Sequence, residues 1–544
     1  MFLARSPLFL VAVIGLLCPE QVTAEAVDDA QVAFNQDNTT EDASITGDLP
    51  DLLHNGIWVE ENKTGLPHAA WAAASRCCTI LAGALPGQVL FPSSAKYHAQ
   101  QSSYYSREQS ELSPSCRVLP ASALDVSTII VTAKQYNCVF AVRSGGHAMA
   151  DLQSNVDATG FTIDLQKMDQ ISVLDEEKTV SFGAGCRWQQ VYAALQPYNR
   201  TTAGGRVPEV GVSGFLLGGG ISALSLAHGF GSSNVVNYQI VLADGSIQDV
   251  NQQTLPDLYW ALKYGSTNFG IVTRFEMTTY PLGDVWGGLL VLDISRGPAL
   301  LQFHVEFAAR LAADPTGLNI VVLAWEPVQK TYVVWSPNLY LSPVAFPPLY
   351  SGLEAFAQDA LVNTLRITDL LSVTGEFQAA AAGHGRVYAF TLTLKADAAL
   401  LWDSHLKGVE IFEPYLTRAG LTWSTIVQPM NRGFAAASVK NGGHPSGIAP
   451  DDGDLVVFLV SALWSEPADD GIIKEKMLEL MEWVERTARA RGLLHPFIYM
   501  NYASGQQDVM GGIGAENLQR MRRAKTLYDP ENQFGKYWKG GFKL

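Results

Sequence analysis

Hydrophobic and polar positions divide the first half of the chain into short apolar runs and stretches with helical spacing. Val139 to Val142 is an unbroken apolar run, which predicts a buried strand. Residues 122–136 before it have helical spacing, with Ser122 as the N-cap and Asp125 in the first turn. A short strand is expected at residues 116–120. The order strand, helix, strand predicts a small α/β unit.

The same patterns continue to about residue 282. Helices are predicted at residues 68–85, 188–195 and 256–262, and strands at 161–165, 179–182, 235–242 and from 271. Asp244-Gly245 is a turn signal that predicts a hairpin after the strand at 235–242. Residues 104–114 are interpreted as a connector.

Glycine marks three turns in this half. Arg143-Ser144-Gly145-Gly146-His147 directly follows the apolar strand, and successive amides in such a turn suit an anion such as pyrophosphate. Gly183-Ala184-Gly185 precedes the helix at residues 188–195. Residues 204–220 contain seven glycines among apolar side chains, which predicts a buried wall against a flat ligand and excludes an ordinary helix.

From Gly283 to about Gly492 strands and helices alternate differently. Strands are expected at residues 289–294, 319–325, 331–335, 387–394 and 455–463, and helices at 299–312, 349–360, 396–418 and 467–491. This order predicts an antiparallel sheet with helices on one side. The proline-rich residues 336–348 are expected to form a loop. Phe497 to Tyr502 alternates like a strand, and a helix is expected at residues 514–528.

Composition changes this picture little. A chain of 544 residues is too long for one simple core, so two domains are expected. Hydrophobic residues make up 47% and charged residues 17%, as in globular proteins. The net charge of −16 disfavours nucleic acid or an anionic membrane as partner.

The N-terminus predicts entry into the secretory pathway. Residues 1–24 resemble a signal peptide, and residues 25–65 are polar and are expected to be mobile. We expect a secreted or lumenal protein with no membrane contact after the signal is removed. The sequons at Asn38, Asn62 and Asn199 fit that location and are candidate glycosylation sites.

Five cysteines remain once Cys18 leaves with the signal. Cys77, Cys78, Cys116 and Cys138 are candidates for two disulfides, whose connectivity the spacing leaves open. Cys186 would then be a buried free thiol. A metal site is not expected, because no second cluster of ligands follows at a suitable spacing.

The Arg-Ser-Gly-Gly-His turn after an apolar strand closely resembles the FAD-binding segment of the vanillyl-alcohol oxidase/p-cresol methylhydroxylase (PCMH) superfamily. Its nearest branch is the fungal berberine-bridge-enzyme-like FAD-linked oxidoreductases. The likeness extends from about Cys77 to the C-terminus. It includes the glycine wall, Gly265 to Thr273, Gln428-Pro429 and Tyr499-Met500-Asn501-Tyr502.

The resemblance implies an α+β fold with a two-part PCMH-type FAD-binding domain and a substrate domain whose antiparallel sheet is covered by helices. We expect the FAD-binding domain at residues 66–282, with its core at 112–282, and the substrate domain at 283–492. Residues 493–544 are expected to return to the FAD-binding domain.

The resemblance also assigns roles to single residues. It implies that His147 is covalently bonded to the flavin. Val207 stands where some relatives have a second flavin-linking cysteine, so only one covalent bond is expected. Val210 matches a position that controls oxygen access. Tyr499 and Gln428 are the catalytic candidates, and the role of His444 stays open. The residues expected at the cofactor are Arg143, Ser144, Gly145, Gly146, His147, Gly185, Gly204, Val210, Gly211, Gly214, Gly219, Gly270, Ile271, Val272, Asn501 and Tyr502.

We therefore expect an FAD-dependent oxidase that takes a hydride from an alcohol or hemiacetal carbon of a small molecule. O2 would accept the electrons and give H2O2. The substrate is either a secondary metabolite or an oligosaccharide. Two alternatives stay open: an oxidative cyclisation enzyme of a biosynthetic pathway, and a secreted binding protein without catalysis. The oligomeric state is not determined by the sequence.

Overall fold

The computed structural model describes residues 68–149, 153–380 and 385–544. The expected signal peptide, the segment at residues 25–65 and the sequons at Asn38 and Asn62 lie outside the described residues. Over the described ranges, no helix is both long enough and apolar enough to cross a membrane.

The first sheet carries the Arg-Ser-Gly-Gly-His turn. Its strands lie in the order β1 (Val89–Leu90), β2 (Arg117–Val118), β4 (Gly160–Asp164) and β3 (Val139–Arg143). Strands β2, β4 and β3 are parallel, and helix α7 (Ala123–Tyr136) connects β2 to β3. Ser122 and Asp125 form a capping box at the start of α7, as predicted.

Two disulfides fasten helix α4 (His68–Ala84) to this sheet. Cys77 is bonded to Cys138, just before β3, and Cys78 is bonded to Cys116, just before β2. Cys186 is free and buried. The segment expected to be a plain connector contains a short helix, α6 (Arg107–Glu111), after α5 (Ala95–Gln101).

The second sheet is antiparallel and has β10 (Ile271–Pro281) near its centre. The other strands are β5 (Ile171–Leu174), β6 (Thr179–Gly183), β8 (Val235–Val241) and β9 (Ile247–Val250), with β7 (Arg200–Thr202) paired to the end of β10. The Asp244-Gly245 hairpin is confirmed between β8 and β9. Helices α8 (Trp188–Leu195) and α11 (Pro256–Leu262) have the predicted bounds.

The glycine wall differs from the prediction. Residues Val212–Leu217 form a short helix, α9, through Gly214, and α10 (Ser225–His228) follows. One glycine inside a helix costs only about 1 kcal/mol. Burial of Val212, Leu216 and their apolar neighbours, which the sequence predicts, offsets that cost.

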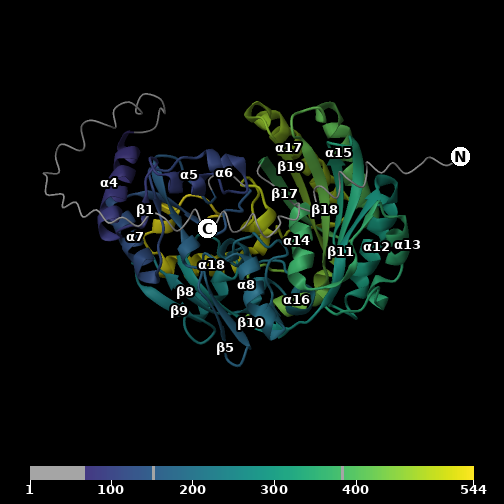
Figure 1. Ribbon diagram of the computed structural model, residues 1–544, viewed down its shortest axis with the longest axis horizontal. Helices are drawn as coiled ribbons and strands as arrows, with labels where there is room; N and C mark the ends of the chain where they lie inside the picture. Colours follow the sequence, from purple (N-terminus) through teal and green to yellow (C-terminus); the bar gives the residue numbers. More distant parts are fainter. Residues whose placement is uncertain (1–67, 150–152, 381–384) are drawn as a thin grey trace, which may run out of the picture. The chain divides into compact units, whose positions relative to one another are not determined.

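The third sheet has ten strands and is antiparallel. In order these are β15 (Val362–Asn363), β11 (Val285–Asp293), β14 (Thr331–Tyr340), β13 (Val321–Glu326), β18 (Thr422–Met430), β19 (Leu455–Trp464), β17 (Arg386–Lys395) and β20 (Leu494–His495), while β12 (Gly317–Asn319) pairs with β14 and β16 (Arg366–Thr368) with β11. Helices α12 (Gly297–Arg310), α15 (Ala398–Phe412) and α17 (Asp470–Ala490) cover one face (Figure 1). Shorter helices are α13 (Leu353–Asp359), α14 (Leu370–Ala380) and α16 (Arg432–Ser438).

Two predictions about this half were wrong. Strand β14 continues to Tyr340, through residues expected to form a loop. Pro337 is tolerated because it faces residue 320, which lies between the end of β12 and the start of β13. There the Pro337 carbonyl accepts a hydrogen bond from the amide of Ile320, and the missing proline N–H interrupts no strand pairing. Residues 500–502 form a 3₁₀ turn instead of a strand. Two hydrogen bonds to distant segments hold that turn: the amide of Ile221 donates to the Tyr499 hydroxyl, and Asn501 Nδ2 donates to the carbonyl of Phe215.

The C-terminal residues return to the first two sheets. After α18 (Ala515–Tyr528) and α19 (Gln533–Lys536), the backbone around Trp538 pairs with Phe140 of β3. The amide of Leu544 donates to the side chain of Asn268. The final segment is drawn beside the strands of the first sheet in Figure 1.

Candidate active site

The turn after β3 lies directly against the glycine wall. A Cβ atom added at Gly145 would be 2.4 Å from the amide nitrogen of Gly211, and one added at Gly211 would be 2.2 Å from that of Gly145. Gly146 adopts φ +70°, which favours glycine. The two glycine segments can therefore approach only as bare backbone.

The third glycine turn joins the same place. The hydroxyls of Ser144 and Ser213 both donate to the carbonyl of Ala184, at 2.7 and 2.6 Å. A Cβ added at Gly185 would lie 1.9 Å from the carbonyl oxygen of Leu165. Three turns that are separate in the sequence thus meet around one backbone surface.

Arg187 connects these turns and was missed from the sequence. One guanidinium nitrogen, Nη2, donates to the carbonyl of Gly145 at 2.8 Å, and the other, Nη1, donates to the carbonyl of Glu209. Burial lowers the pKa of Arg187, and the charge of Arg143 lowers it further. No motif marks Arg187, because its partners are two backbone carbonyls far away in the chain.

The turn can accept the pyrophosphate of FAD. Gly145 and Gly146 are buried, and their amide N–H groups donate to no other residue in the part of the chain that the structure describes. Buried amides without an acceptor are rare, and consecutive ones form an anion site. Gly214 is exposed, and a Cβ there would meet nothing within 4 Å, which leaves room for a ligand beside α9.

Other expected cofactor residues support the turns through protein contacts. The guanidinium of Arg143 is buried and binds the carbonyls of Gln100 and Ser103 and the carboxylate of Asp164. A Cβ at Gly204 would lie 2.2 Å from the ring of Trp188. Arg143 and Gly204 therefore contact neighbouring protein groups that support the turns.

His147 lies at the end of the turn and stacks on Tyr105. The ring centroids are 4.0 Å apart and the planes differ by 19°. Burial, and then the neighbouring Tyr502, raise the pKa of Tyr105 to about 12. His147 and Tyr502 are therefore both neighbours of Tyr105.

The hydroxyl oxygen of Tyr502 has two donors. Arg206 Nη2 is 3.0 Å away and Gln428 Nε2, from β18, is 3.2 Å away. Tyr502 is partly exposed, whereas Arg206 and Gln428 are buried. A cation and an amide donor on one phenol oxygen stabilise negative charge there.

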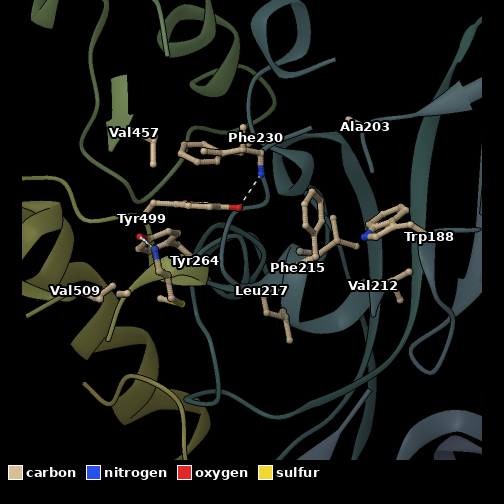
Figure 2. Packing of buried hydrophobic residues seen from close by; sticks show 14 of the residues in the cluster. Trp188, Ala203, Val212, Phe215, Leu217, Phe230, Tyr264, Val457, Tyr499 and Val509 are labelled. Atoms are coloured by element: carbon tan, nitrogen blue, oxygen red, sulfur yellow. Dashed lines mark hydrogen bonds between the residues drawn. The ribbon is translucent and has the colours of Figure 1, made fainter. Parts of the chain in front are cut away.

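Tyr499 is placed differently. Its oxygen accepts from the amide of Ile221 at 2.9 Å and from Asn501 Nδ2 at 3.1 Å. Its side chain is 2% exposed, and burial raises its pKa. Figure 2 shows its ring among Phe230, Tyr264 and Val457. Tyr499 therefore ties the C-terminal turn to the glycine wall.

Asn501 makes a second tie between the same segments. Its amide donates to the carbonyl of Phe215 at 3.0 Å. A Cβ at Gly218 would lie 2.0 Å from its side-chain oxygen. The glycine is thus required for the close approach of Asn501. Gly219, with φ +93°, is the next residue of the wall.

The closing segment and His444 lie among other partners. Gly270, Ile271 and Val272 begin β10 beside β8, where a Cβ at Gly270 would meet the carbonyl of Val241 at 2.5 Å. His444 stacks on Phe230 with a centroid distance of 4.2 Å, and its Nδ1 accepts from the Ser446 amide at 3.1 Å. Burial lowers the pKa of His444, so it is neutral and structural.

Among the described residues, no group of three or more His, Cys, Asp or Glu could hold a metal ion. The site consists instead of glycine turns for an anion and a phenol with two donors.

Comparison with known proteins identifies the family of this chain. Residues 114–251 match the FAD binding domain family. The FAD-dependent monooxygenase drtC of Aspergillus calidoustus is 33% identical over 521 residues, which cover 94% of this chain and 97% of that protein.

Two solved structures share the fold. The berberine-bridge-enzyme-like protein 1 of Physcomitrella patens has a TM-score of 0.67 at 20% identity, over 84% of this chain and 97% of its own. Glucooligosaccharide oxidase of Acremonium strictum is described with a 6-S-cysteinyl, 8α-N1-histidyl FAD. It has a TM-score of 0.67 at 18% identity, over 86% of this chain and 98% of that chain. These similarities confirm the expected fold class and the use of FAD.

Proposed function

The chain belongs to the berberine-bridge-enzyme-like FAD-linked oxidoreductases, and we propose that it takes a hydride from an alcohol or hemiacetal carbon of a small molecule. The observation that carries this proposal is the pair of donors on Tyr502. Arg206 and Gln428 stabilise a phenolate, which a base for a substrate hydroxyl requires.

We place the base at Tyr502 and not at Tyr499, the residue favoured by sequence. Both donors on the Tyr499 oxygen are neutral amides, and its ring is buried. Tyr502 is partly exposed and its oxygen has a cationic donor. A base must be within hydrogen-bond reach of the proton it removes, which favours the accessible tyrosine.

The proposed reaction converts an alcohol to a carbonyl group. Tyr502 takes the hydroxyl proton, and Arg206 and Gln428 hold the phenol oxygen in position. When bound, FAD would supply the hydride acceptor and the route for two electrons to O2, which with two protons would give H2O2. The glycine turns hold the cofactor, and Arg187 keeps two of these turns together.

We further propose that His147 holds the flavin covalently and alone. Its ring lies at the end of the anion turn and is fixed by stacking on Tyr105. Val207 offers no thiol for a second bond. The doubly linked flavin named for the Acremonium strictum oxidase supports a histidyl bond at this position.

Flavin fluorescence on a denaturing gel tests both the cofactor and the bond. Wild-type protein should keep fluorescence in its band after acid precipitation, and a His147→Ala variant should release the flavin. A dark wild-type band beside a yellow supernatant would refute the covalent bond. Absence of flavin from both fractions of folded protein would refute the proposed function.

A second candidate reaction is monooxygenation, which is favoured by the relative from Aspergillus calidoustus, because that relative is named a monooxygenase. In that case one oxygen atom of O2 would enter the product and the other would leave as water, with the two electrons for its reduction coming from the substrate or from an added reductant. Turnover under ¹⁸O2 separates the two reactions, because an oxidase puts the label into peroxide and a monooxygenase puts it into the product. Product analysis in the same assay would reveal a cyclised product.

We also propose a secreted protein. Support comes from two disulfides and from the exposed position of Asn199 in a left-handed turn. Expression with the natural N-terminus should deliver the protein to the medium. Glycosidase treatment should then lower its apparent mass, and Asn199→Gln should remove part of that shift.

A further inference from the structure

Arg206 is a buried cation without an acidic partner. Its side chain is 9% exposed, and over the described ranges it forms no ion pair with Asp or Glu. Nη2 donates to Tyr502, but Nη1 is buried and has no hydrogen-bond partner. Burying a charge without compensation costs several kcal/mol. Such a cation is therefore retained where a ligand supplies the missing acceptor and negative charge.

The neighbours of Arg206 do not supply the missing negative charge. The pKa values of Tyr192 and Tyr499 are raised by burial, against the smaller lowering effect of the Arg206 charge. Both phenols are therefore neutral at neutral pH. The Tyr192 hydroxyl also donates a hydrogen bond to the carbonyl of Gly205 at 2.8 Å. The compensating charge must come from Tyr502 or from a bound molecule.

Gln428 leaves a second group unpartnered at the same place. Its side chain is 3% exposed, and its Nε2 donates to Tyr502. Its Oε1 is buried and has no hydrogen-bond partner among the residues that the structure describes. A cationic N–H donor and an amide oxygen acceptor thus flank the Tyr502 hydroxyl.

We propose that Arg206 Nη1 binds an oxyanion of the substrate, a carboxylate or enolate oxygen close to the hydroxyl that is oxidised. Gln428 Oε1 then accepts from a neighbouring substrate hydroxyl. This inference rests on the proposed function and narrows its substrate class. An oxyanion pairs Arg206 Nη1 with a negative charge, whereas a neutral sugar hydroxyl leaves the compensation of Arg206 to Tyr502 alone. Acidic alcohols are therefore favoured over neutral oligosaccharides.

Arginine suits this role because its two terminal nitrogens can serve two oxygens at once. One nitrogen holds the base and the other holds the substrate, which fixes the substrate hydroxyl relative to Tyr502. Charge-assisted hydrogen bonds are also stronger than neutral ones in a site that excludes water.

Binding of benzoate and benzamide to the flavin-loaded protein tests the proposal without turnover. The two probes have similar shape, but only benzoate is an anion at neutral pH. Affinities are measured by calorimetry and by the change in the visible absorbance of the flavin. Wild-type protein should bind benzoate at least about tenfold more tightly than benzamide, and added salt should reduce the difference.

Variants identify the responsible cation. Arg206→Gln should bring the ratio of the two affinities close to one, and Arg206→Lys should keep part of the preference. Arg200→Gln is the control, because the Arg200 side chain is partly buried and, among the described residues, binds only Thr279. Flavin content and melting temperature of each variant report whether it folds.

Three results would overturn the proposal. They are an equal benzoate preference in wild type and Arg206→Gln, no preference in wild type, and no binding of either probe. If Arg206→Gln changed the flavin reduction potential but left the benzoate preference unchanged, Arg206 would be assigned to an interaction with the flavin and not with the substrate. The proposed function fails separately, by absence of flavin or of alcohol oxidation, and neither result depends on benzoate.

Discussion

At the scale of single residues, the site depends on arginines used in two ways. Arg187 satisfies two backbone carbonyls and so holds glycine turns together. Arg206 has only a phenol partner and keeps one nitrogen without a partner inside the described structure. The first arrangement is complete without a ligand and the second is not. Arg187 is therefore assigned to positioning and Arg206 to binding.

Substitution of Tyr502 by phenylalanine should slow turnover without loss of flavin. Removing a proton acceptor from the reacting hydroxyl should lower kcat by roughly 10²- to 10⁴-fold. Steady-state kinetics and gel fluorescence measure both effects. Tyr499→Phe serves as the comparison and should mainly lower the melting temperature, since it removes a tie to Ile221. A larger loss of kcat in Tyr499→Phe would move the base to Tyr499.

Arg187→Met should weaken FAD binding, because the Gly145 and Glu209 carbonyls lose a shared donor. Hydrogen bonds to charged groups contribute about 1.5–3 kcal/mol, so the dissociation constant should rise roughly 10- to 100-fold. Fluorescence titration of apo-protein in a His147→Ala background keeps binding reversible. Riboflavin, which lacks the pyrophosphate, should be affected less. An equal loss for both ligands would contradict a role in the anion turn.

At the scale of elements, helix α15 shows how packing determines a titration. His405 lies between Trp402 and Trp423, at centroid distances of 5.3 and 5.5 Å, and is 1% exposed. Burial lowers its pKa to about 4. His304 of α12 is equally buried, and its pKa is also lowered to about 4. Both helices therefore pack on the sheet with neutral histidines.

These histidines should destabilise the protein in acid. As pH falls from about 6.5 to 4 the unfolded chain binds protons that the folded chain does not, so the free energy of unfolding decreases. The shift corresponds to at most about 3 kcal/mol for each histidine. His405→Phe keeps the stacking and should flatten part of this decline. Melting temperatures across the range measure it, with exposed His98→Gln as control. An unchanged slope in His405→Phe would exclude His405 as a cause.

At the scale of the whole molecule, a buried charge cluster joins α6 to the ten-stranded sheet. Glu108 accepts from Lys474 at 2.7 Å and from the amide of Val387 at 3.2 Å. Arg386 bonds Asp470 and Glu111. Because α6 follows Tyr105, this cluster links the sheet that carries Gln428 to the ring that stacks on His147.

Glu108→Gln should destabilise the fold by about 3 kcal/mol, because Lys474 and Arg386 lose a buried counter-charge. Denaturant unfolding measures this change. Glu531→Gln is the control, since its pair with Lys134 is exposed and should contribute less than about 1 kcal/mol. Equal effects of the two substitutions would show that the cluster adds no more than a surface pair.

Local signals were enough for many elements. Ser122 and Asp125 mark the start of α7, and Pro256 marks the start of α11, because capping and proline act within a few residues. The anion surface that the glycine turns indicate stays a prediction. Pro337 misled the interpretation of β14, since its tolerance depends on a gap between two other strands.

The sequence by itself determined the FAD-binding class, most of the elements and the set of cysteines available for disulfides. These depend on residue types at short spacing. Only the tertiary structure decided the cysteine pairing, the place of Arg187 and the choice of Tyr502 over Tyr499. Arg206 and Tyr502 are 296 residues apart, and Gln428 and Tyr502 are 74 apart. Contacts at such separations arise from the packing of whole sheets, which no local pattern encodes.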